Sequence, residues 1–456
     1  MSRDLLLDRA HAHARAFLDT LGSRPVHART QDPPIDAALD EDGADPAAVL
    51  DALARAMDAG GLATAGPRYF GFVTGGSHPV AVAADWLVSA WDQNAALHVM
   101  SPAMAAVEDA AAAWLLDLFA LPAAASVGFV TGATMANVTC LAAARHEVLR
   151  RAGWDVEANG FQRAPPLRVI AGAHAHASIE SAARLLGFGT ANLIRAAADG
   201  QGRMVPDALE AALRAGSGPS IVCLQAGHVN TGAFDPFEPL VAIARRHHAW
   251  VHVDGAFGLW ARAVPEMRHL AAGLEGADSW GVDAHKWLNV PYDSGIAIVA
   301  HPAAHRASMA QTASYLLRAA GERRDGMDWT PEASRRARAV PIHAVLKTLG
   351  RRGVAGLVTR GCALARQMAD RLRRQAGITI LNDVVLNQVL VRARARDGRN
   401  VTPAVIAAVQ EEGVCWVGGT TWEREPAMRI SISNWATSPD DIERSAASIV
   451  HAVDRC

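Results

Sequence analysis

The sequence predicts an α/β fold built around a largely parallel sheet, and two observations carry this prediction. Between about residues 127 and 300, short apolar runs of β-type composition alternate with helical runs, which is typical of strand–helix–strand units. The chain has 456 residues, which suits one large domain with smaller appendages. Because such sheets bind ligands beyond the carboxyl ends of their strands, residues that follow the apolar runs are the first candidates for a functional site.

Residues 1–66 predict a helical N-terminal segment, which turn-forming residues interrupt at Asp32-Pro33-Pro34 and at Gly60-Gly61. Its amphipathic helices have no obvious partner within the segment, so we expect them to pack across a homodimer. The opening residues carry charges throughout and lack an apolar core of signal-peptide length. The most apolar stretches of the chain are short or interrupted by charge, so no transmembrane span is expected.

Residues 67–344 predict the large domain. Two helical stretches open it, and Ser101 with Pro102 is a plausible start of the second one. The apolar runs VGFVTG, LRVIAG, SIVCLQAG, WVHVDGAF and GIAIVA then predict strands. Residues 345–456 predict a small C-terminal α+β domain, in which helices alternate with the strands VVLNQVLVRAR and MRISISNW.

Composition narrows the class of protein. The net charge of -2 and the pI of about 6.8 give no reason to expect nucleic acid or an anionic membrane as a partner. The five cysteines are scattered, odd in number and without metal-ligand spacing, so we expect reduced thiols in a cytoplasmic protein and no metal site. They are Cys140, Cys223, Cys362, Cys415 and Cys456.

The chain contains only two lysines, Lys286 and Lys347, and the other 42 of its 44 Lys and Arg residues are arginine. Codon bias explains this imbalance without any function. A lysine can nevertheless do what arginine cannot, because its amine can lose a proton and attack a carbonyl group. Either lysine is therefore a candidate for imine chemistry.

Asp254 ends the apolar run WVHVD, and Lys286 follows 32 residues later in the turn Asp283-Ala284-His285-Lys286. Alone, Asp254 reads as a turn or helix-capping residue. Together, a carboxylate at a strand end and a lysine in a turn can converge on one aromatic cofactor. The carboxylate would pair with a protonated pyridine nitrogen, and the lysine would form the imine.

Two further loops contain residues that could bind parts of such a cofactor. The turn Thr131–Asn137 opens a helix with small residues, and backbone N–H groups at a helix N-terminus favour an anion such as phosphate. Many strand–helix turns share this pattern. The turn after LRVIAG contains His174 and His176, either of which could lie over a planar cofactor or simply be solvated.

These segments, in their order, resemble the group II pyridoxal-phosphate-dependent decarboxylases, which include aromatic-L-amino-acid, glutamate and histidine decarboxylases. The matching segments are Thr131–Asn137, HASIESAARLLG, QAGHVNTGAFDP, HVDGAFG and DAHKW. The resemblance extends from PRYFGFVTGG to MRISISNW, most of the chain. It implies the fold type I of pyridoxal-phosphate-dependent transferases, pyridoxal 5'-phosphate as the cofactor, an amino acid as the substrate and a homodimer.

The resemblance also implies roles for individual residues. Lys286 matches the lysine that forms the Schiff base, Asp254 the aspartate paired with the pyridine nitrogen, and His176 the histidine stacked on the ring. These three are the expected catalytic residues, and all three bind the cofactor. The other expected cofactor-binding residues are Gly132, Ala133, Thr134, Gln225, Ala256, Asp283 and His285. The expected substrate-binding residues are Tyr69, Phe72, Thr74, His98 and Arg429, although Arg429 reads equally well as a surface arginine on a strand.

Several positions depart from the family pattern, among them Gly255, where Ala is frequent. The phosphate loop reads Gly-Ala-Thr-Met where many members have Gly-Gly-Ser/Thr-Glu, and Gln225 stands where many have Thr. Asp283 stands where Asn is common. An acid beside a phosphate repels it unless the acid is bonded to a donor. None of these departures removes a group that the imine chemistry requires.

The expected reaction is decarboxylation of an L-amino acid to the amine and CO2 through an aldimine on Lys286. In the family, a mobile loop supplies a tyrosine that reprotonates the product carbon. The corresponding stretch here begins near Tyr315, and residues 316–340 contain no tyrosine. Either Tyr315 or a histidine takes this role, or the reaction ends differently. An aldehyde synthase, which couples decarboxylation to oxidative deamination, and a catalytically silent binding protein of the same fold both stay open.

The expected substrate pocket is apolar to mixed in character. Tyr69, Phe72, Val73 and Thr74 favour an aromatic amino acid over glutamate. His98 could equally bind a polar side chain. The sequence therefore favours an aromatic substrate without singling one out.

Overall fold

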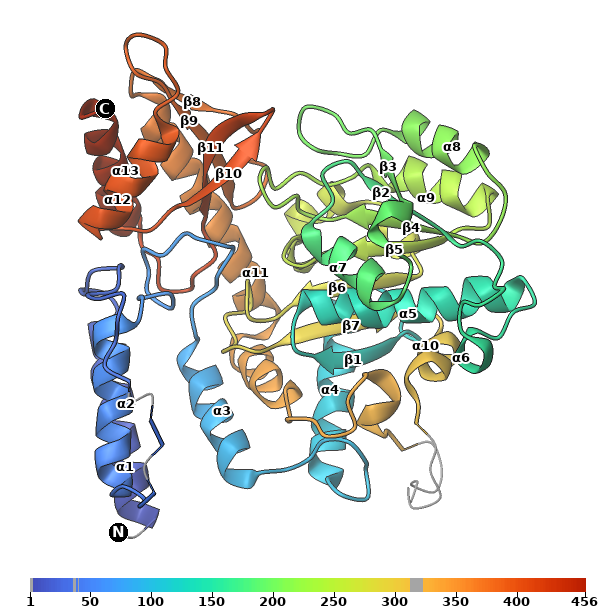
Figure 1. Cartoon of the computed structure of the whole chain (residues 1–456), viewed down its shortest axis with the longest axis horizontal. Helices are drawn as coiled ribbons and strands as arrows, with labels where there is room; N and C mark the ends of the chain where they lie inside the picture. The colour runs from blue at the N-terminus through green and yellow to red at the C-terminus, as the bar shows by residue number, and fades with distance from the viewer. Residues whose placement is uncertain (1–2, 36–37, 40, 312–322) are drawn as a thin grey trace. The chain divides into compact units, whose positions relative to one another are not determined.

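The computed structural model of the chain describes residues 3–35, 38–39, 41–311 and 323–456 (Figure 1). The chain forms two compact units. The first unit consists of Met1–Gly76, Leu364–Leu381 and Val389–Cys456, and the second unit consists of Ser77–Ala363 and Asn382–Gln388. The division into domains at residues 66 and 344 stays a prediction.

A seven-stranded sheet forms the core of the second unit, in the strand order β1-β7-β6-β5-β4-β2-β3. The strands from β6 to β3 pair in parallel, whereas β7 is antiparallel to both of its neighbours, β6 and β1. The predicted α/β class with a mostly parallel sheet is therefore confirmed. The strands are β1 Ser126–Val130, β2 Arg168–Gly172, β3 Leu193–Ala196, β4 Ser220–Gln225, β5 Trp250–Asp254, β6 Ser279–Asp283 and β7 Gly295–Val299.

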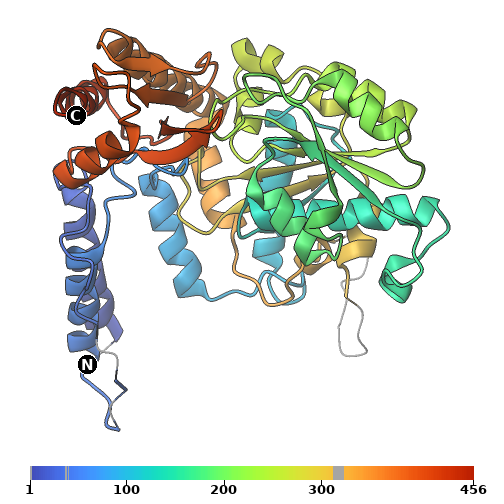
Figure 2. The ribbon, with the colours of Figure 1, turned by 45° about the horizontal axis from the view of Figure 1, so that its top comes forward.

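Helices cover both faces of this sheet (Figure 2). Helices α5 and α7 lie on one face, and α8 and α9 lie on the other, as right-handed crossovers between parallel strands require. Every residue of β1, β5, β6 and β7 is buried, which explains why β1, β5 and β7 read as apolar runs. The strand β6, with the sequence SWGVD, was not predicted. The covering helices are α5 Ala133–Arg151, α7 Ala177–Leu185, α8 Pro206–Arg214 and α9 Phe237–Arg246.

The remaining helices of the second unit surround this core. Helix α4 begins at Pro102 directly after Ser101, as expected, although the Ser101 side chain makes no capping hydrogen bond. Helix α11 runs from the second unit into the first and contains a non-helical residue at Gly350. These helices are α3 Pro79–Trp91, α4 Pro102–Leu118, α6 Val156–Asn159, α10 Pro302–Met309 and α11 Ala339–Arg373, with short 3-10 helices at Thr190–Asn192, Gly258–Ala263, Pro265–Ala271, Leu274–Gly276 and Gly326–Trp329.

The first unit joins the N-terminal segment to the C-terminal part of the chain. The buried guanidinium of Arg68 donates to the carbonyl oxygens of Gly22 at 2.8 Å and Val414 at 2.7 Å. The unit contains a four-stranded sheet in the order β10-β11-β9-β8, which is the predicted C-terminal α+β element. Its elements are α1 Arg3–Thr20, α2 Pro46–Gly60, β8 Ile378–Ile380, β9 Gln388–Ala393, α12 Thr402–Glu412, β10 Gly418–Trp422, β11 Glu425–Ser431 and α13 Pro439–Asp454.

A search of the described ranges finds no helix that is long and apolar enough to cross a membrane.

A buried ion cluster anchors the segment that begins at residue 323 to the second unit. Glu108, which is 1% exposed, accepts from Arg335 Nη1 at 2.5 Å and from Arg324 Nε at 2.8 Å. Arg335 also donates to the carbonyl oxygens of Ala95 and Phe129. One carboxylate therefore ties two arginines of this segment to α4 and to the edge strand β1.

We expect Arg335→Met to lower the free energy of unfolding by about 3–5 kcal/mol, because it leaves Glu108 buried with half of its charge compensation. Denaturant unfolding of the purified protein measures this loss. The neighbouring exposed pair Arg336–Asp85 is the control, and Arg336→Met should cost only about 0–1 kcal/mol. Equal losses for the two variants would contradict the assignment of Glu108 as a buried anchor.

Candidate active site

The residues expected to bind the cofactor lie in the second unit, at or just after strand ends. Gln225, Asp254 and Asp283 are the last residues of the parallel strands β4, β5 and β6. Gly132 precedes α5 just after β1, and His176 precedes α7 after β2. Because these strands run in the same direction, their carboxyl ends bring all five residues to one edge of the sheet.

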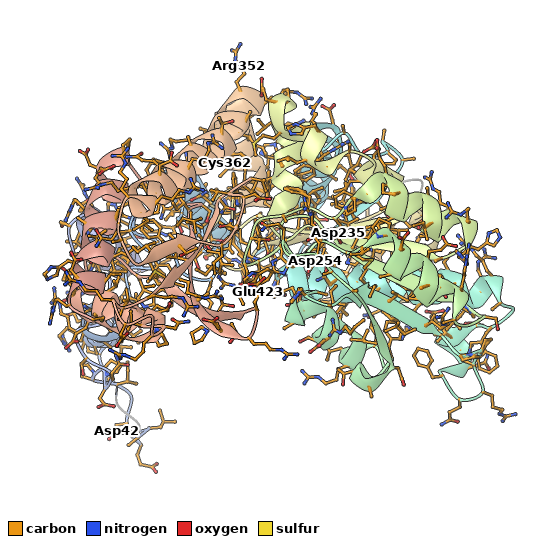
Figure 3. The ribbon with its side chains drawn as sticks, turned by 90° about the horizontal axis from the view of Figure 1, so that it is seen from above. Asp42, Asp235, Asp254, Arg352, Cys362 and Glu423 are labelled. Atoms are coloured by element: carbon orange, nitrogen blue, oxygen red, sulfur yellow. The ribbon has the colours of Figure 1, made fainter. Side chains whose placement is uncertain are left out.

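Asp254 is a buried carboxylate, only 4% exposed, which Figure 3 labels within the second unit. Its Oδ2 accepts from Asn137 Nδ2 at 3.2 Å and from Ser178 Oγ at 3.1 Å, and its Oδ1 accepts from the Ala256 N–H at 3.2 Å. All three donors are neutral. In the part of the chain that the structure describes, no cationic side chain pairs with this carboxylate.

Lys286 and Asp283 form an ion pair within one turn. Lys286 Nζ lies 2.8 Å from Asp283 Oδ2, and the Asp283 side chain is 2% exposed. The other oxygen, Asp283 Oδ1, accepts from the backbone N–H of Ala133 at 2.6 Å. Ala133 is the first residue of α5, so a carboxylate of the protein already occupies one donor at the N-terminus of this helix.

His285 lies beside this pair and is neutral. Burial is the largest influence on its imidazole and lowers its pKa below the usual value. Nδ1 accepts from the Ser294 N–H at 3.2 Å, so the ring proton sits on Nε2, which is 3.5 Å from Asp283 Oδ1. The ring stacks on Tyr292 with centroids 4.2 Å apart.

Ser294 contributes a polar atom at the start of β7. Its hydroxyl oxygen is buried and makes no hydrogen bond with the described residues. The next residue, Gly295, approaches the loop before α5 so closely that a Cβ atom would lie 2.4 Å from Gly132 Cα. Glycine is therefore required at 295, where the backbone of this loop meets β7.

His176 and Gln225 are positioned by backbone contacts. His176 caps α7, because its Nδ1 accepts from the Ser178 N–H at 3.1 Å, and the imidazole is exposed. The N–H of Gln225 donates to the buried carboxylate of Asp235 at 2.7 Å, and burial raises the pKa of Asp235 to about 6. Ala256 is half-buried directly after Asp254, and Thr134 is exposed in the first turn of α5.

The expected substrate-binding residues fall in both units. His98 lies in the second unit, where its N–H donates to Asp325 Oδ1 at 2.8 Å. Tyr69, Phe72, Thr74 and Arg429 belong to the first unit. Tyr69 stacks on Trp416 with centroids 4.9 Å apart, Phe72 is 65% exposed with φ at 53°, and Arg429 pairs with Gly418 between β11 and β10. Tyr315 lies outside the described residues.

The residues around Asp254 and Lys286 fit an anionic aromatic cofactor with a cationic ring nitrogen. A buried carboxylate that accepts only from neutral donors favours a cation beside it, because the cation offsets the desolvation penalty of the buried charge. The N-terminus of α5 and the unpaired hydroxyl of Ser294 are suitable donors for a phosphate. Pyridoxal phosphate combines these groups with an aldehyde that a lysine amine can attack.

Sequence reasoning missed four residues of this site. Asn137 and Ser178 bind Asp254 directly, Ser294 offers the unpaired hydroxyl, and His252 contacts Asn137. One signal was available for His252, because a histidine in the middle of a fully apolar strand must have a buried partner.

Comparisons with known proteins give a consistent result. A family model described as the pyridoxal-dependent decarboxylase conserved domain matches residues 29–394. An L-2,4-diaminobutyrate decarboxylase of Rhizobium meliloti (strain 1021) is 30% identical over 383 residues, which are 80% of this chain and 74% of that protein. The human acidic amino acid decarboxylase GADL1 is 28% identical over 69% of this chain and 61% of its own length. A phenylacetaldehyde synthase of a Rosa hybrid cultivar is 26% identical over 69% of this chain and 64% of its own length.

Solved structures agree on the fold. The Oryza sativa protein TDC, solved with PLP and tryptamine, superposes with a TM-score of 0.91 and 24% identity, and the match covers 100% of this chain and 99% of the other. At this level of identity the likeness concerns the fold, and it confirms the expected fold type I.

We expect Asp283→Asn to strengthen binding of pyridoxal phosphate, because the aspartate carboxylate lies on the helix N–H that an incoming phosphate would use. The gain should be about tenfold in the dissociation constant, or ~1.4 kcal/mol. Fluorescence titration of the apoprotein measures it. Asp278→Asn is the control, because Asp278 also accepts a backbone N–H, that of Val251, but lies just before β6, at the other end of this strand from Asp283. Weaker binding by Asp283→Asn would mean that the carboxylate supports the cofactor.

Proposed function

The chain belongs to the pyridoxal-dependent decarboxylase family, and on this premise we propose that it converts an L-amino acid to the corresponding amine and CO2, with Lys286 as the residue that carries the cofactor. The observation that most supports the proposal is the buried carboxylate of Asp254, which has neutral donors and no cation among the described residues. Asp254 and Lys286 lie at the same edge of the sheet. Imine formation requires a lysine, and a protonated ring nitrogen requires a carboxylate beside it.

Pyridoxal phosphate, when bound, supplies an electron-accepting ring that takes up the electron pair left by the departing carboxylate. Asp254 would hold a proton on the ring nitrogen, since a buried carboxylate stabilises a cation beside it. The N-terminus of α5 and Ser294 would hold the phosphate. His176, whose imidazole is exposed at the start of α7, would lie against the ring.

Lys286 needs its amine unprotonated to react with a carbonyl group. Asp283 Oδ2 lies 2.8 Å away, and a carboxylate at this distance stabilises the ammonium form of the lysine, so this ion pair would have to be released before the amine reacts. A guanidinium at position 286 could pair with Asp283 but could not react.

An aromatic amino acid is the substrate class that we favour. Tyr69 and Phe72 both lie against the ring of Trp416, with centroids 4.9 and 5.4 Å apart. Aromatic side chains favour further aromatic partners in offset or edge-on contacts. The three relatives named above carry names that refer to diaminobutyrate, to acidic amino acids and to an aromatic aldehyde. A panel of test substrates must therefore include diamino, acidic and aromatic amino acids.

An aldehyde synthase is the second candidate, and the similarity to phenylacetaldehyde synthase favours it. Residues 316–340 contain no tyrosine that could reprotonate the product carbon. If reprotonation fails, oxidation by O2 and hydrolysis by water yield an aldehyde, ammonia and hydrogen peroxide in place of the amine. In the decarboxylase, either Tyr315 or a histidine would supply the proton.

A homodimer in the cytoplasm is the state that we propose for the protein. Val49, Leu53 and Met57 follow one another at four-residue intervals along α2, and they are 44%, 54% and 46% exposed. Such a stripe on one side of a helix is suited to packing against a second copy of the chain.

Lys286→Arg should lower turnover of a panel of aromatic, acidic and diamino L-amino acids by roughly 1,000-fold or more and abolish the visible absorbance of the bound cofactor, because the imine cannot form. Amine, aldehyde and peroxide are each measured, so the same experiment separates decarboxylase from synthase. Lys347→Arg, at the only other lysine, should behave as the wild type. A wild-type protein that stays colourless and inactive with added cofactor would favour the silent binding protein.

Leu53→Arg should shift the protein from dimer to monomer in light scattering, because it places a charge in the exposed stripe of α2. Arg55→Glu, which changes charge on another side of the same helix, should leave the dimer intact. A fully active monomeric wild type would rule out the proposed assembly.

A further inference from the structure

Three alternate residues of β5 share one face of the strand, and hydrogen bonds link them through two neighbouring elements. Trp250 Nε1 donates to Ser279 Oγ on β6 at 2.9 Å, and Ser279 Oγ lies 3.0 Å from His252 Nδ1. His252 Nε2 lies 3.0 Å from Asn137 Oδ1 on α5. Asn137 Nδ2 donates to Asp254 Oδ2 at 3.2 Å, which completes the chain.

The two ends of this chain determine the direction of every hydrogen bond in it. A carboxylate only accepts, so the amide of Asn137 turns its NH2 group to Asp254 and its oxygen to His252. That oxygen needs the His252 proton on Nε2, which leaves Nδ1 to accept from the Ser279 hydroxyl. Ser279 Oγ in turn accepts from Trp250, whose indole only donates. One arrangement of hydrogens satisfies all five groups.

These groups are buried, so water cannot replace any partner in this arrangement of hydrogen bonds. Trp250, His252, Asn137 and Ser279 are each 0% exposed. Burial is the largest influence on His252 and lowers its pKa to about 4, so the imidazole is neutral and has one donor and one acceptor. The strand β6 makes room for the chain, because a Cβ atom on Gly281 would lie 2.6 Å from Asn137 Oδ1.

We propose that His252 and Asn137 are positioning residues for Asp254, which orient its carboxylate toward the cofactor's ring nitrogen; this inference rests on the proposed function. Oδ2 accepts two hydrogen bonds, from Asn137 and Ser178, whereas Oδ1 accepts one from the Ala256 N–H. Oδ1 therefore retains an acceptor position for the cofactor.

Packing alone does not account for this chain of groups. An interface between a helix and a fully buried sheet is stabilised as well by apolar side chains, and each buried polar group adds a desolvation cost. Here one end of the polar chain is the carboxylate of the site. A carboxylate held by neutral donors keeps its full charge available to a cation, whereas an arginine in place of Asn137 would neutralise it.

The experiment compares His252→Gln with His252→Leu in protein reconstituted with pyridoxal phosphate. The Gln amide can accept from Ser279 and donate to Asn137 in the same order as the imidazole, whereas Leu can do neither. Val251→Ala is the control for lost packing, since Val251 is buried on the opposite face of β5. Asn137→Leu tests the second link of the chain.

We expect His252→Leu and Asn137→Leu to lower kcat by about 10- to 100-fold at nearly unchanged KM, as misplacement of a reacting group does. They should also weaken cofactor binding and shift the visible absorbance band of the bound cofactor. His252→Gln should restore most of the wild-type absorbance and kcat, and Val251→Ala should leave both intact while lowering the melting temperature.

The inference is overturned if folded His252→Leu keeps the absorbance and kcat of the wild type. It is also overturned if Val251→Ala shows the same losses as His252→Leu, or if Gln is no better than Leu in a folded protein. Failure of the wild type itself to bind the cofactor or to release CO2 would overturn the proposed function instead, so the two failures are distinguishable.

Discussion

The buried charge of Asp254 is the constraint on which the rest of the site depends. A carboxylate at 4% exposure without a cationic partner among the described residues is expensive to maintain. Three neutral donors offset part of that cost, and each comes from a different position: α5, the start of α7 and the turn after β5. The packing of α5 and α7 on one face of the sheet is what brings these donors to one point.

The amino-acid pattern predicts the framework of this site well. Continuous apolar runs identify buried parallel strands, and a parallel sheet places the residues after those runs at one edge. This reasoning found Asp254 and the loop before α5, and the scarcity of lysine drew attention to Lys286. The strand β6 was not predicted, and Asp283 was identified as a site residue only through the resemblance. The assignment of their roles came from the resemblance to a family, since the spacing of residues alone does not define a cofactor.

The hydrogen-bond partners could not be predicted in the same way. Asn137, Ser178 and Ser279 meet Asp254 and His252 across sequence separations of 27 to 117 residues, and their types are common at helix starts and strand ends. The same is true of Glu108, whose two arginine partners follow it by more than 200 residues. Asp283 shows how a departure from a family pattern can be accommodated, because the acid is bonded to a helix N–H and to Lys286.

The shortage of lysine has a consequence for chemical self-damage. Aldehydes form adducts with primary amines far more readily than with guanidinium groups, which stay protonated. Outside the site, the only lysine is Lys347, which is exposed on α11 with its ammonium 5.7 Å from the centroid of the Trp114 ring. A protein that works with an aldehyde cofactor, and whose relatives include a producer of aldehydes, thus presents one lysine amine outside the site to stray carbonyl compounds, while arginine supplies its other cationic side chains.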